Sequence, residues 1–424
     1  MSRSRRLPTP AQPTTRGAAR LRPGAASARQ SSLRASNLAL LASHVFASAR
    51  PVSRADVAAA TGMTRSTASR LADELVASGV LAELEPVAGA GPGRPAVPLT
   101  PARGTFAALG MEVNVSRMTV RAVDLAGSVL GQRVVLDDFE ASDPSVVLAR
   151  LAGLAGEVLA LEEVRRARTV GAALALPGLV SSDTLLRAPN LGWHELDPRP
   201  HLAAVLEPAG FGLRLGNEAD FGALTVGRSR PAAAHASSSF IYLSGEIGVG
   251  ASIVRDSRVM HGAHGFAGEI GHVQVDPQGP RCGCGNRGCL ERYAGRRHIL
   301  AEAGMPATAG PAQLVAAWEA GDPRAREAVS GAARALGVGL AAAINILDIP
   351  TVVLGGHLAP LAELLGPELA AEIDRRVLAA PWAAPQILTA TADEGDGATG
   401  AAWSVLEEVV ADPAAFAGSA ESAG

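Results

Sequence analysis

The segment Glu269-Ile-Gly-His272, followed ten residues later by Cys282-Gly-Cys284-Gly-Asn-Arg-Gly-Cys289, is the most diagnostic part of this chain. The chain has three cysteines, and all of them fall within these eight residues. Three thiolates and one imidazole form a complete tetrahedral donor set for zinc, and the glycines between them permit tight turns. We therefore predict a structural Zn²⁺ that shapes a loop and is held by His272, Cys282, Cys284 and Cys289. The alternative is a glycine-rich loop with three reduced thiols.

The composition is that of a large globular protein. A chain of 424 residues predicts two or three domains, and 48% apolar residues can bury a large core. No apolar run reaches the ~18 residues that a membrane span needs, and the arginine-rich N-terminus lacks the apolar centre of a secretory signal. Clustered thiols with metal-ligand spacing suit a reducing compartment. We expect a cytoplasmic protein without membrane contact.

Positive charge is concentrated at the N-terminal end. Residues 1–104 hold 14 arginines and 5 acidic residues, a net +9, whereas the other 320 residues hold 24 arginines and 36 acidic residues, a net −12. A basic front on an acidic body favours an anionic partner, most simply nucleic acid. Residues 1–30, rich in Pro, Ala, Ser and Arg, are predicted to be a disordered basic tail. The alternative for this tail is a solvated segment with no partner.

Residues 31–103 have the pattern of a winged helix-turn-helix domain. A helical pattern starts near Ser32 and runs to about residue 49, with leucine, valine and phenylalanine on one side. Ser53 is a good N-cap for a short second helix, and Thr64 is a good N-cap for a longer third helix after a Thr-Gly turn. This spacing is typical of a helix-turn-helix unit, in which the last of these helices reads DNA.

The outward face of the third helix carries short polar side chains and guanidinium groups, which suit base edges and phosphates. The predicted DNA contacts on it are Thr64, Arg65, Ser66, Thr67, Ser69 and Arg70. Two apolar strands follow, joined by a glycine-rich tip, and together they predict a wing. Arg94 on this tip is expected to enter a minor groove, where negative potential favours arginine. The alternative is a small helical unit that docks on the body or on a partner protein.

From Phe106 onward, strands alternate with helices, which predicts the α/β class. A helix is expected from Pro144 to about Arg165. Core strands are expected at residues 107–112, 117–124, 128–136, 169–176, 237–244 and 351–354.

Several distinct short motifs, most of them rich in glycine, lie along this α/β region. They are Ala188-Pro-Asn190-Leu-Gly-Trp193, Gly216-Asn217-Glu218-Ala219, Ser244-Gly-Glu-Ile-Gly-Val-Gly250, Gly262-Ala-His-Gly-Phe-Ala-Gly-Glu269-Ile-Gly-His272, Cys282 to Glu291, Asn345-Ile-Leu-Asp348 and Val353-Leu-Gly-Gly356. With the N-terminal unit, they make residues 33–410 resemble a transcriptional regulator of the ROK family (repressors, open reading frames and sugar kinases). The resemblance implies an actin-like, ribonuclease-H-type fold of two lobes around a sugar-binding cleft.

Polar residues in these motifs suit a sugar, because each sugar hydroxyl both donates and accepts a hydrogen bond. Glu269 and Glu291 flank the cysteine motif, and a metal there would hold both of their loops. One nitrogen of His272 can bind zinc while the other meets a hydroxyl. Asn217 and Glu218 follow a strand end, where α/β folds place ligand groups. By resemblance, Asn190 and the Gly178 backbone complete the sugar site. The alternative is that Glu218, Glu269 and Glu291 are ordinary surface carboxylates.

Kinases of this family carry an Asp-x-Gly-x-Thr phosphate loop, which here reads Glu112-Val-Asn114-Val-Ser116. Asn114 replaces the glycine that lets backbone NH groups approach a phosphate. Glu246 stands where the second phosphate loop of the kinases has a threonine, and Glu218 replaces their catalytic aspartate. These departures predict that the protein is not an enzyme. The alternatives are an ATP-dependent, glucokinase-like sugar kinase and a DNA-binding protein whose body is a scaffold.

The predicted function is a DNA-binding regulator, most simply a repressor, whose operator affinity is changed by a monosaccharide or amino sugar in the cleft. A homodimer or a dimer of dimers would present its reading heads to half-sites one helical turn, or a multiple, apart. The expected organisation is a tail (1–30), the winged domain (31–103), the ROK domain (104–412) and a second disordered tail (413–424). Within the ROK domain, residues 104–216 with the C-terminal helix form one lobe, and residues 217–390 form the other.

Overall fold

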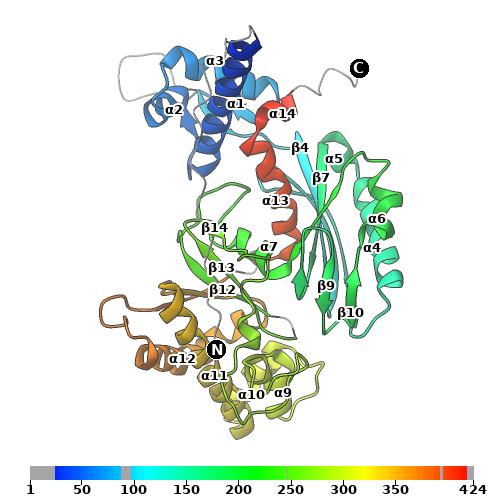
Figure 1. Ribbon diagram of the computed structural model, residues 1–424, viewed down its shortest axis with the longest axis vertical. Helices are drawn as coiled ribbons and strands as arrows, with labels where there is room; N and C mark the ends of the chain where they lie inside the picture. The colour runs from blue at the N-terminus through cyan, green and yellow to red at the C-terminus, as the bar shows by residue number, and fades with distance from the viewer. Residues whose placement is uncertain (1–23, 87–96, 246, 392–394, 418–424) are drawn as a thin grey trace, which may run out of the picture.

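The structure is a computed structural model that describes residues 24–86, 97–245, 247–391 and 395–417. Figure 1 shows a small, mostly helical N-terminal unit, coloured blue, above a body built from two lobes that each contain a sheet. The long helix α13 (Gly397–Ala411) lies at the centre, between the N-terminal unit and both lobes. The predicted class, an α/β body behind a winged helix-turn-helix unit, is confirmed.

Local capping sets the helix-turn-helix geometry. The N-terminal unit contains α1 (Gly24–Ala47), β1 (Val52–Ser53), α2 (Arg54–Thr61), α3 (Arg65–Ala77), β2 (Leu81–Glu83) and β3 (Pro98–Pro101), with strand order β1-β3-β2. Ser53 and Asp56 form a capping box at the start of α2, and Gly62, at φ 72°, ends that helix. The Thr64 hydroxyl accepts a hydrogen bond from the Thr67 amide and starts α3.

The first helix is longer than predicted. It begins at Gly24, so residues 24–30 are helical and the prediction of disorder is wrong for them. The sequence from Ala25 to Ser36 contains no glycine or proline, and alanine, arginine and glutamine extend a helix at little cost. Residues 1–23 and 87–96 lie outside the described residues, and the latter range includes the predicted wing tip with Arg94.

The first lobe is built on a mixed sheet with strand order β11-β7-β4-β5-β6. The strands are β4 (Phe106–Val113), β5 (Arg117–Asp124), β6 (Val129–Leu136), β7 (Arg168–Leu176) and β11 (Leu213–Asn217). Helices α4 (Pro144–Leu159), α5 (Glu162–Arg166) and α6 (Arg199–Leu206) lie on one side of the sheet, and α13 packs on the other. The helix predicted from Pro144 to about Arg165 is therefore two helices, because the chain leaves helical geometry at Leu161 (φ −63°, ψ 140°).

A second, smaller sheet covers the end of this lobe that faces the cleft. It consists of β8 (Leu179–Val180), β9 (Leu185–Ala188) and β10 (Trp193–Leu196), in the order β10-β9-β8. The Trp193 ring is fully buried, and its Nε1 donates a hydrogen bond to the Ser142 carbonyl at 3.0 Å. This anchor holds the Asn190 loop, which precedes Trp193, against the lobe.

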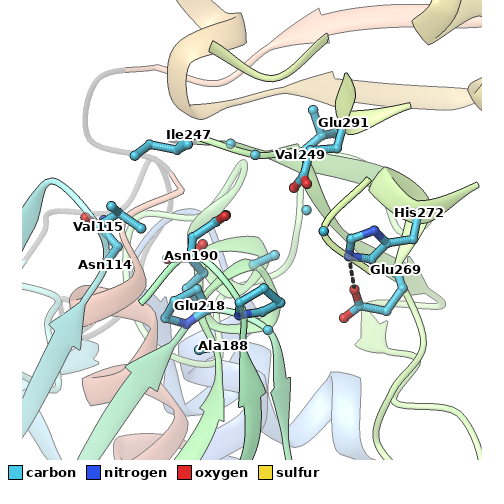
Figure 2. Close-up of a pocket in the computed structure, with 18 of the residues that line it drawn as sticks. Asn114, Val115, Ala188, Asn190, Glu218, Ile247, Val249, Glu269, His272 and Glu291 are labelled. Atoms are coloured by element: carbon cyan, nitrogen blue, oxygen red, sulfur yellow. Dashed lines mark ion pairs between the residues drawn. The ribbon is translucent and has the colours of Figure 1, made fainter. Parts of the chain in front are cut away.

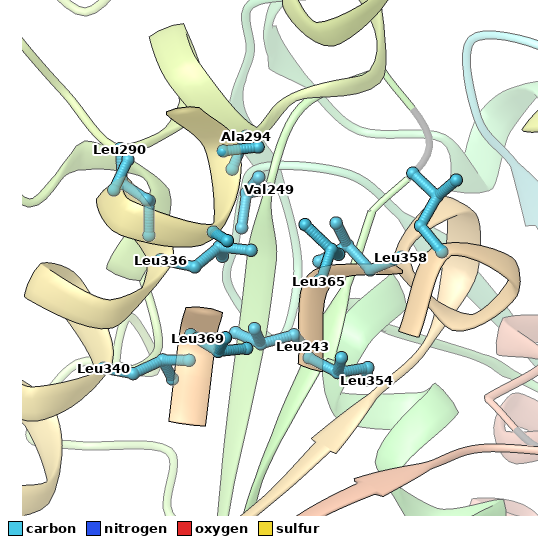
Figure 3. Packing of buried hydrophobic residues seen from close by; sticks show 14 of the residues in the cluster. Leu243, Val249, Leu290, Ala294, Leu336, Leu340, Leu354, Leu358, Leu365 and Leu369 are labelled. Carbon is cyan, nitrogen blue, oxygen red and sulfur yellow. The ribbon is translucent and has the colours of Figure 1, made fainter. Parts of the chain in front are cut away.

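The second lobe is built on a sheet with strand order β14-β13-β12-β15-β16. Its strands are β12 (Phe240–Ser244), β13 (Gly250–Arg255), β14 (Arg258–Val259), β15 (Thr351–Leu354) and β16 (Gln386–Thr389). Its helical elements are η1 (Ile270–His272), α8 (Glu291–Ala294), α9 (Arg296–Glu302), α10 (Pro311–Glu319), α11 (Pro323–Leu347), η2 (Gly356–Leu361) and α12 (Ala362–Arg376). Figure 3 shows leucines of α11, α12 and η2 packed against β12 and β15 around Leu243.

Among the described residues, α11 is the one helix long and apolar enough to cross a membrane by length and composition. Its apolar face, including Leu336 and Leu340, is fully buried in the core of the second lobe. Core helices of globular lobes commonly have this composition, so α11 is a packing element.

Two helices connect the parts of the molecule. Helix α7 (Glu218–Thr225) leaves β11 and packs against α13 and against strands of the second lobe. Phe46 of α1 and Leu71 of α3 belong to the same apolar cluster as Trp403 and Leu406 of α13. Helix α14 (Pro413–Ala417) packs on α1, so the predicted disordered tail is wrong for residues 413–417, whereas residues 418–424 lie outside the described residues. The N-terminal unit is therefore docked on the element that also joins the lobes.

Candidate functional site

A polar cavity of about 240 Å³ lies between the two lobes. Figure 2 shows Asn114, Ala188 and Asn190 of the first lobe on one side and Val249, Glu269, His272 and Glu291 of the second lobe on the other. All seven residues predicted to bind a sugar line it, namely Gly178, Asn190, Asn217, Glu218, Glu269, His272 and Glu291. A small cavity with many hydrogen-bonding groups suits a small polyhydroxylated ligand.

Glu291 and Asn190, from different lobes, approach the same point of the backbone. A methyl group at Gly248 would overlap a Glu291 carboxylate oxygen and would lie 3.5 Å from the Asn190 amide nitrogen. Any larger residue at position 248 would displace the Glu291 carboxylate from its present place, whereas Asn190 would be left in ordinary contact. A carboxylate and an amide that converge in this way can accept from and donate to neighbouring hydroxyl groups.

Glu269 and His272 form the opposite wall. Glu269 Oε2 lies 3.9 Å from His272 Nε2, and Figure 2 shows both side chains at the same side of the cavity. Burial is the largest effect on Glu269 and raises its pKa above the ordinary value; His272 opposes this rise, and Glu291 and Asp220 add to it. A carboxylate in such a place gains from hydroxyl donors that replace the lost water.

Asn217 is engaged by the protein itself. Its Oδ1 accepts hydrogen bonds from the Ala219 and Asp220 amides at 2.7 and 3.4 Å and caps α7. Its Nδ2 donates to the Gly178 carbonyl at 2.8 Å. Gly178 has φ +87°, and a Cβ there would overlap the Arg187 carbonyl, so only glycine fits. Asn217 thus joins the start of α7 to the Gly178 turn, and it orients Glu218, the first residue of that helix.

The cysteines and His272 converge as a metal-binding set. The ligand atoms of His272, Cys282, Cys284 and Cys289 all lie within 4.8 Å of one another. Cys284 Sγ is 3.6 Å from Cys289 Sγ, and Cys282 Sγ is 3.8 Å from His272 Nδ1. These separations match the edges of a tetrahedron with bonds of about 2.0–2.3 Å to a central ion. His272 presents Nδ1 to this set and Nε2 to Glu269.

Three thiolates this close together repel one another unless a cation lies between them, so without one the thiols stay protonated. Burial raises the pKa of Cys289 to about 12, and hydrogen bonds with Cys284 and Cys282 contribute to the rise. The loop also depends on glycines, since a Cβ at Gly288, which has φ +62°, would overlap the Asp276 carbonyl. The residues present fit a Cys₃His metal centre.

Three basic residues that line the cavity belong to none of the sequence motifs and were not predicted as site residues. Arg292, Arg297 and His298 line the cavity from α8 and α9, directly after Glu291. Arg297 forms a bidentate ion pair with Glu140 of the first lobe, with N–O distances of 2.9 and 2.6 Å. Their proximity to Glu291 in the sequence could have indicated that they line the cavity, but arginine and histidine after a helix start are usually solvated.

A second cavity, of about 380 Å³, lies beside the first, and Glu218 lines both. Its other residues include Glu112, Arg117, Tyr242, Gly395 and Asp396. Glu112 is 3% exposed, and its Oε2 forms an ion pair with Arg117 Nη2 at 3.2 Å. Glu112 begins the segment that the resemblance to the ROK kinases aligned with their first phosphate loop, whereas Glu246, aligned with the second, lies outside the described residues.

Asn114 closes the loop that borders this second cavity. Asn114 Oδ1 accepts hydrogen bonds from the Ser116 and Arg117 amides at 3.0 and 2.9 Å, and its Nδ2 donates to Glu112 at 3.3 Å. Two backbone amides that could bind a phosphate oxygen are therefore already used within the loop.

The predicted reading helix is accessible. Thr64, Arg65, Ser66 and Arg70 are exposed on α3, whereas Thr67 and Ser69 are half-buried. Arg34 and Arg54 of the same unit are paired with carboxylates, but Arg65 and Arg70 have no ion pair or side-chain hydrogen bond within the described parts of the chain. Thr64 Oγ1 lies 3.0 and 2.9 Å from the Ser66 and Thr67 hydroxyl oxygens and is occupied by capping.

Comparisons with known proteins agree with this architecture. Residues 121–408 match the ROK family, and residues 44–85 match the IclR helix-turn-helix domain. The xylose repressor of Caldicellulosiruptor bescii is 27% identical over 342 residues, which cover 77% of this chain and 84% of the repressor.

Two solved structures are also similar. The crystal structure of a ROK family transcriptional regulator, a homolog of E. coli MLC, has a TM-score of 0.72 and 25% identity, and the match covers 91% of this chain and 99% of that one. The ROK hexokinase from Thermus thermophilus has a TM-score of 0.58 and 30% identity, covering 72% of this chain and 99% of that one. The ROK match extends over more than half of the sequence, and the chain therefore belongs to the ROK family and carries a helix-turn-helix domain in front of its two lobes.

Proposed function

We propose that this protein is a sugar-responsive transcriptional repressor of the cytoplasm that binds operator DNA through α3 and a sugar in the interlobe cavity. The observation that carries the proposal is that one apolar cluster joins α1 and α3 of the DNA-reading unit to α13 of the two-lobed body. Similarity to the xylose repressor and to the MLC homolog supports the repressor assignment. A homodimer, or a dimer of dimers, would present two reading helices to an operator.

The coupling follows from the placement of the cavity. A sugar that contacts both Asn190 and Glu291 binds most tightly when the lobes are closed, so it shifts the population toward that arrangement. Helix α7 begins at the cavity with Glu218 and packs on α13, which carries the DNA-reading unit. Differential affinity of this kind changes operator binding by roughly 5–150-fold, or about 1–3 kcal/mol.

Arg65 and Arg70 are expected to carry much of the DNA affinity. Replacing either by alanine should cost about 1–3 kcal/mol if its guanidinium contacts a guanine edge, because no side chain among residues 24–86, 97–245, 247–391 and 395–417 pairs with it. Fluorescence anisotropy with labelled operator measures this loss. Arg165→Ala, at an exposed arginine of α5 on the body, is the matched control and should bind like the wild type. Unchanged affinity of both α3 variants would show that α3 is not the reading helix.

The metal centre is proposed to hold Zn²⁺ through His272, Cys282, Cys284 and Cys289, because this donor set and its spacing suit that ion. When bound, zinc supplies a fixed four-coordinate crosslink and no open position. The crosslink would fix the positions of the residues beside the metal ligands. His272 presents Nε2 toward Glu269, and Glu291 follows Cys289 by two residues, so both cavity carboxylates adjoin the crosslinked loops.

The kinase alternative is supported by the 30% identity to the Thermus hexokinase and by Glu218, whose carboxylate lies between two cavities. It is disfavoured because Asn114 uses the amides of Ser116 and Arg117, and because buried Glu112 would repel a triphosphate.

We expect no ADP release above background when the protein is incubated with Mg·ATP and a panel of sugars. The matched reference is a ROK hexokinase assayed under identical conditions. Turnover approaching ~1 per second, the low end for ordinary enzymes, would instead assign Glu218 as the catalytic base.

The proposed function is tested by a thermal-shift panel of monosaccharides, amino sugars and their derivatives, followed by operator binding with each ligand found. A ligand that raises the melting temperature and weakens operator binding supports the proposal. A protein that binds its operator equally with every sugar would be a DNA-binding protein with a scaffold body.

A further inference from the structure

The wall of the interlobe cavity formed by α8 and α9 carries three basic side chains. Arg292, Arg297 and His298 all line the cavity, as does Asn190 of the first lobe. Neutral hydroxyl groups do not require such a wall, since the carboxylates and amides of the cavity already match them. The wall therefore has a use that the recognition of a neutral sugar does not explain.

Arg292 has a buried donor in this wall that no acceptor of the described residues satisfies. Its Nε is buried without a hydrogen-bond partner, and its side chain has no ion pair within the parts of the chain that the structure describes. A buried NH donor without an acceptor is unfavourable unless a ligand supplies one. Arginine presents several NH donors in a planar fork, which matches the geometry of a phosphate or a carboxylate.

The neighbours of Arg292 have different partners. Arg297 is neutralised by Glu140 across the cleft and so closes the cavity rather than adding free charge. The His298 ring has no hydrogen-bond partner in the described residues, and it lies in the positive field of both arginines. Burial, together with Arg292 and Arg297, lowers the pKa of His298 to about 4. At neutral pH its ring is therefore uncharged and can donate one hydrogen bond.

We propose that Arg292 and His298 form an anion subsite of the cavity, and that the effector is a monosaccharide bearing one anionic group, a phosphate or a carboxylate. This inference rests on the proposed function, because it names the class of ligand for the same cavity. The anionic group would accept hydrogen bonds from the guanidinium NH groups of Arg292 and from the His298 ring. The sugar hydroxyls would remain with Asn190, Glu269, His272 and Glu291.

The test is isothermal titration calorimetry of the full-length, zinc-loaded protein. The ligands are aldoses and hexosamines, each with its 1-phosphate, its 6-phosphate and the corresponding uronate. We expect one anionic derivative to bind at least tenfold more tightly than its parent sugar. Phosphates and uronates form separate arms, so the arm that binds identifies the anionic group. Arg292→Gln should reduce the preference for the anion to less than threefold, and Arg292→Lys should retain part of it.

Arg296→Gln, four residues along the chain and outside the cavity lining, is the matched control and should keep the full preference. Melting temperatures of all variants verify that they fold. If a neutral sugar binds as tightly as its derivatives, or if Arg292→Gln leaves the preference unchanged in a folded protein, the anion subsite is wrong while the proposed function stands. If no sugar of any class binds, the proposed function itself fails.

Discussion

Glu269→Ala should abolish the response of operator binding to sugar while leaving the affinity for DNA in the absence of sugar nearly unchanged. Glu269 lines the interlobe cavity and faces His272, whereas the predicted DNA-reading helix belongs to the N-terminal unit at one end of α13. Loss of this carboxylate leaves sugar hydroxyl groups without acceptors, at a cost of about 1–3 kcal/mol for each buried group. Without binding there is no shift between lobe arrangements.

The measurement is operator affinity with and without the ligand found by thermal shift, for wild type and variant in parallel. Glu302→Ala, at an exposed carboxylate of α9 outside the cavity lining, is the matched control and should respond like the wild type. Glu269→Gln retains the size and one acceptor oxygen, so an intermediate response is expected. If Glu269→Ala responds as the wild type does, the effector binds elsewhere.

Cys284→Ser should lose zinc and destabilise the second lobe. Cys284 is half-buried and 3.6 Å from Cys289, so the substitution removes one ligand without creating a buried void. A structural metal contributes directly to folding, and its loss belongs to the few single changes that cost on the order of 3–5 kcal/mol. In a domain of this size the melting temperature should fall by roughly 10 °C. Elemental analysis and thermal unfolding measure the two effects.

Gln278→Ala, an exposed change in the same loop, is the control and should retain zinc and stability. Chelation of zinc from the wild-type protein should reproduce the behaviour of Cys284→Ser and weaken sugar binding, because Glu269 and Glu291 flank the ligands. Purified wild-type protein without zinc, with three thiols that react freely in the folded state, would contradict the metal assignment.

Local sequence patterns predicted most elements of the fold. The strand predicted at residues 117–124 has those bounds as β5, and Ser53 and Thr64 cap α2 and α3 as expected. Capping, turns and strand alternation act over a few residues, so they can be recognised in one sequence. Patterns failed where local preferences are weak, as at the start of α1, at Gly24, and at the break near Leu161.

Sequence alone determined which residues are available: a His/Cys cluster with metal-ligand spacing, a helix-turn-helix unit and the polar residues that line the interlobe cavity. Only the tertiary structure decided their partnerships. It brings Asn190 and Glu291 from different lobes close to Gly248, uses Asn217 as a cap, and leaves the Arg292 side chain without an ion pair among the described residues. The reason is physical. A side chain's chemistry is local, but its hydrogen-bond partners and its loss of water depend on which distant segments the packed core brings together.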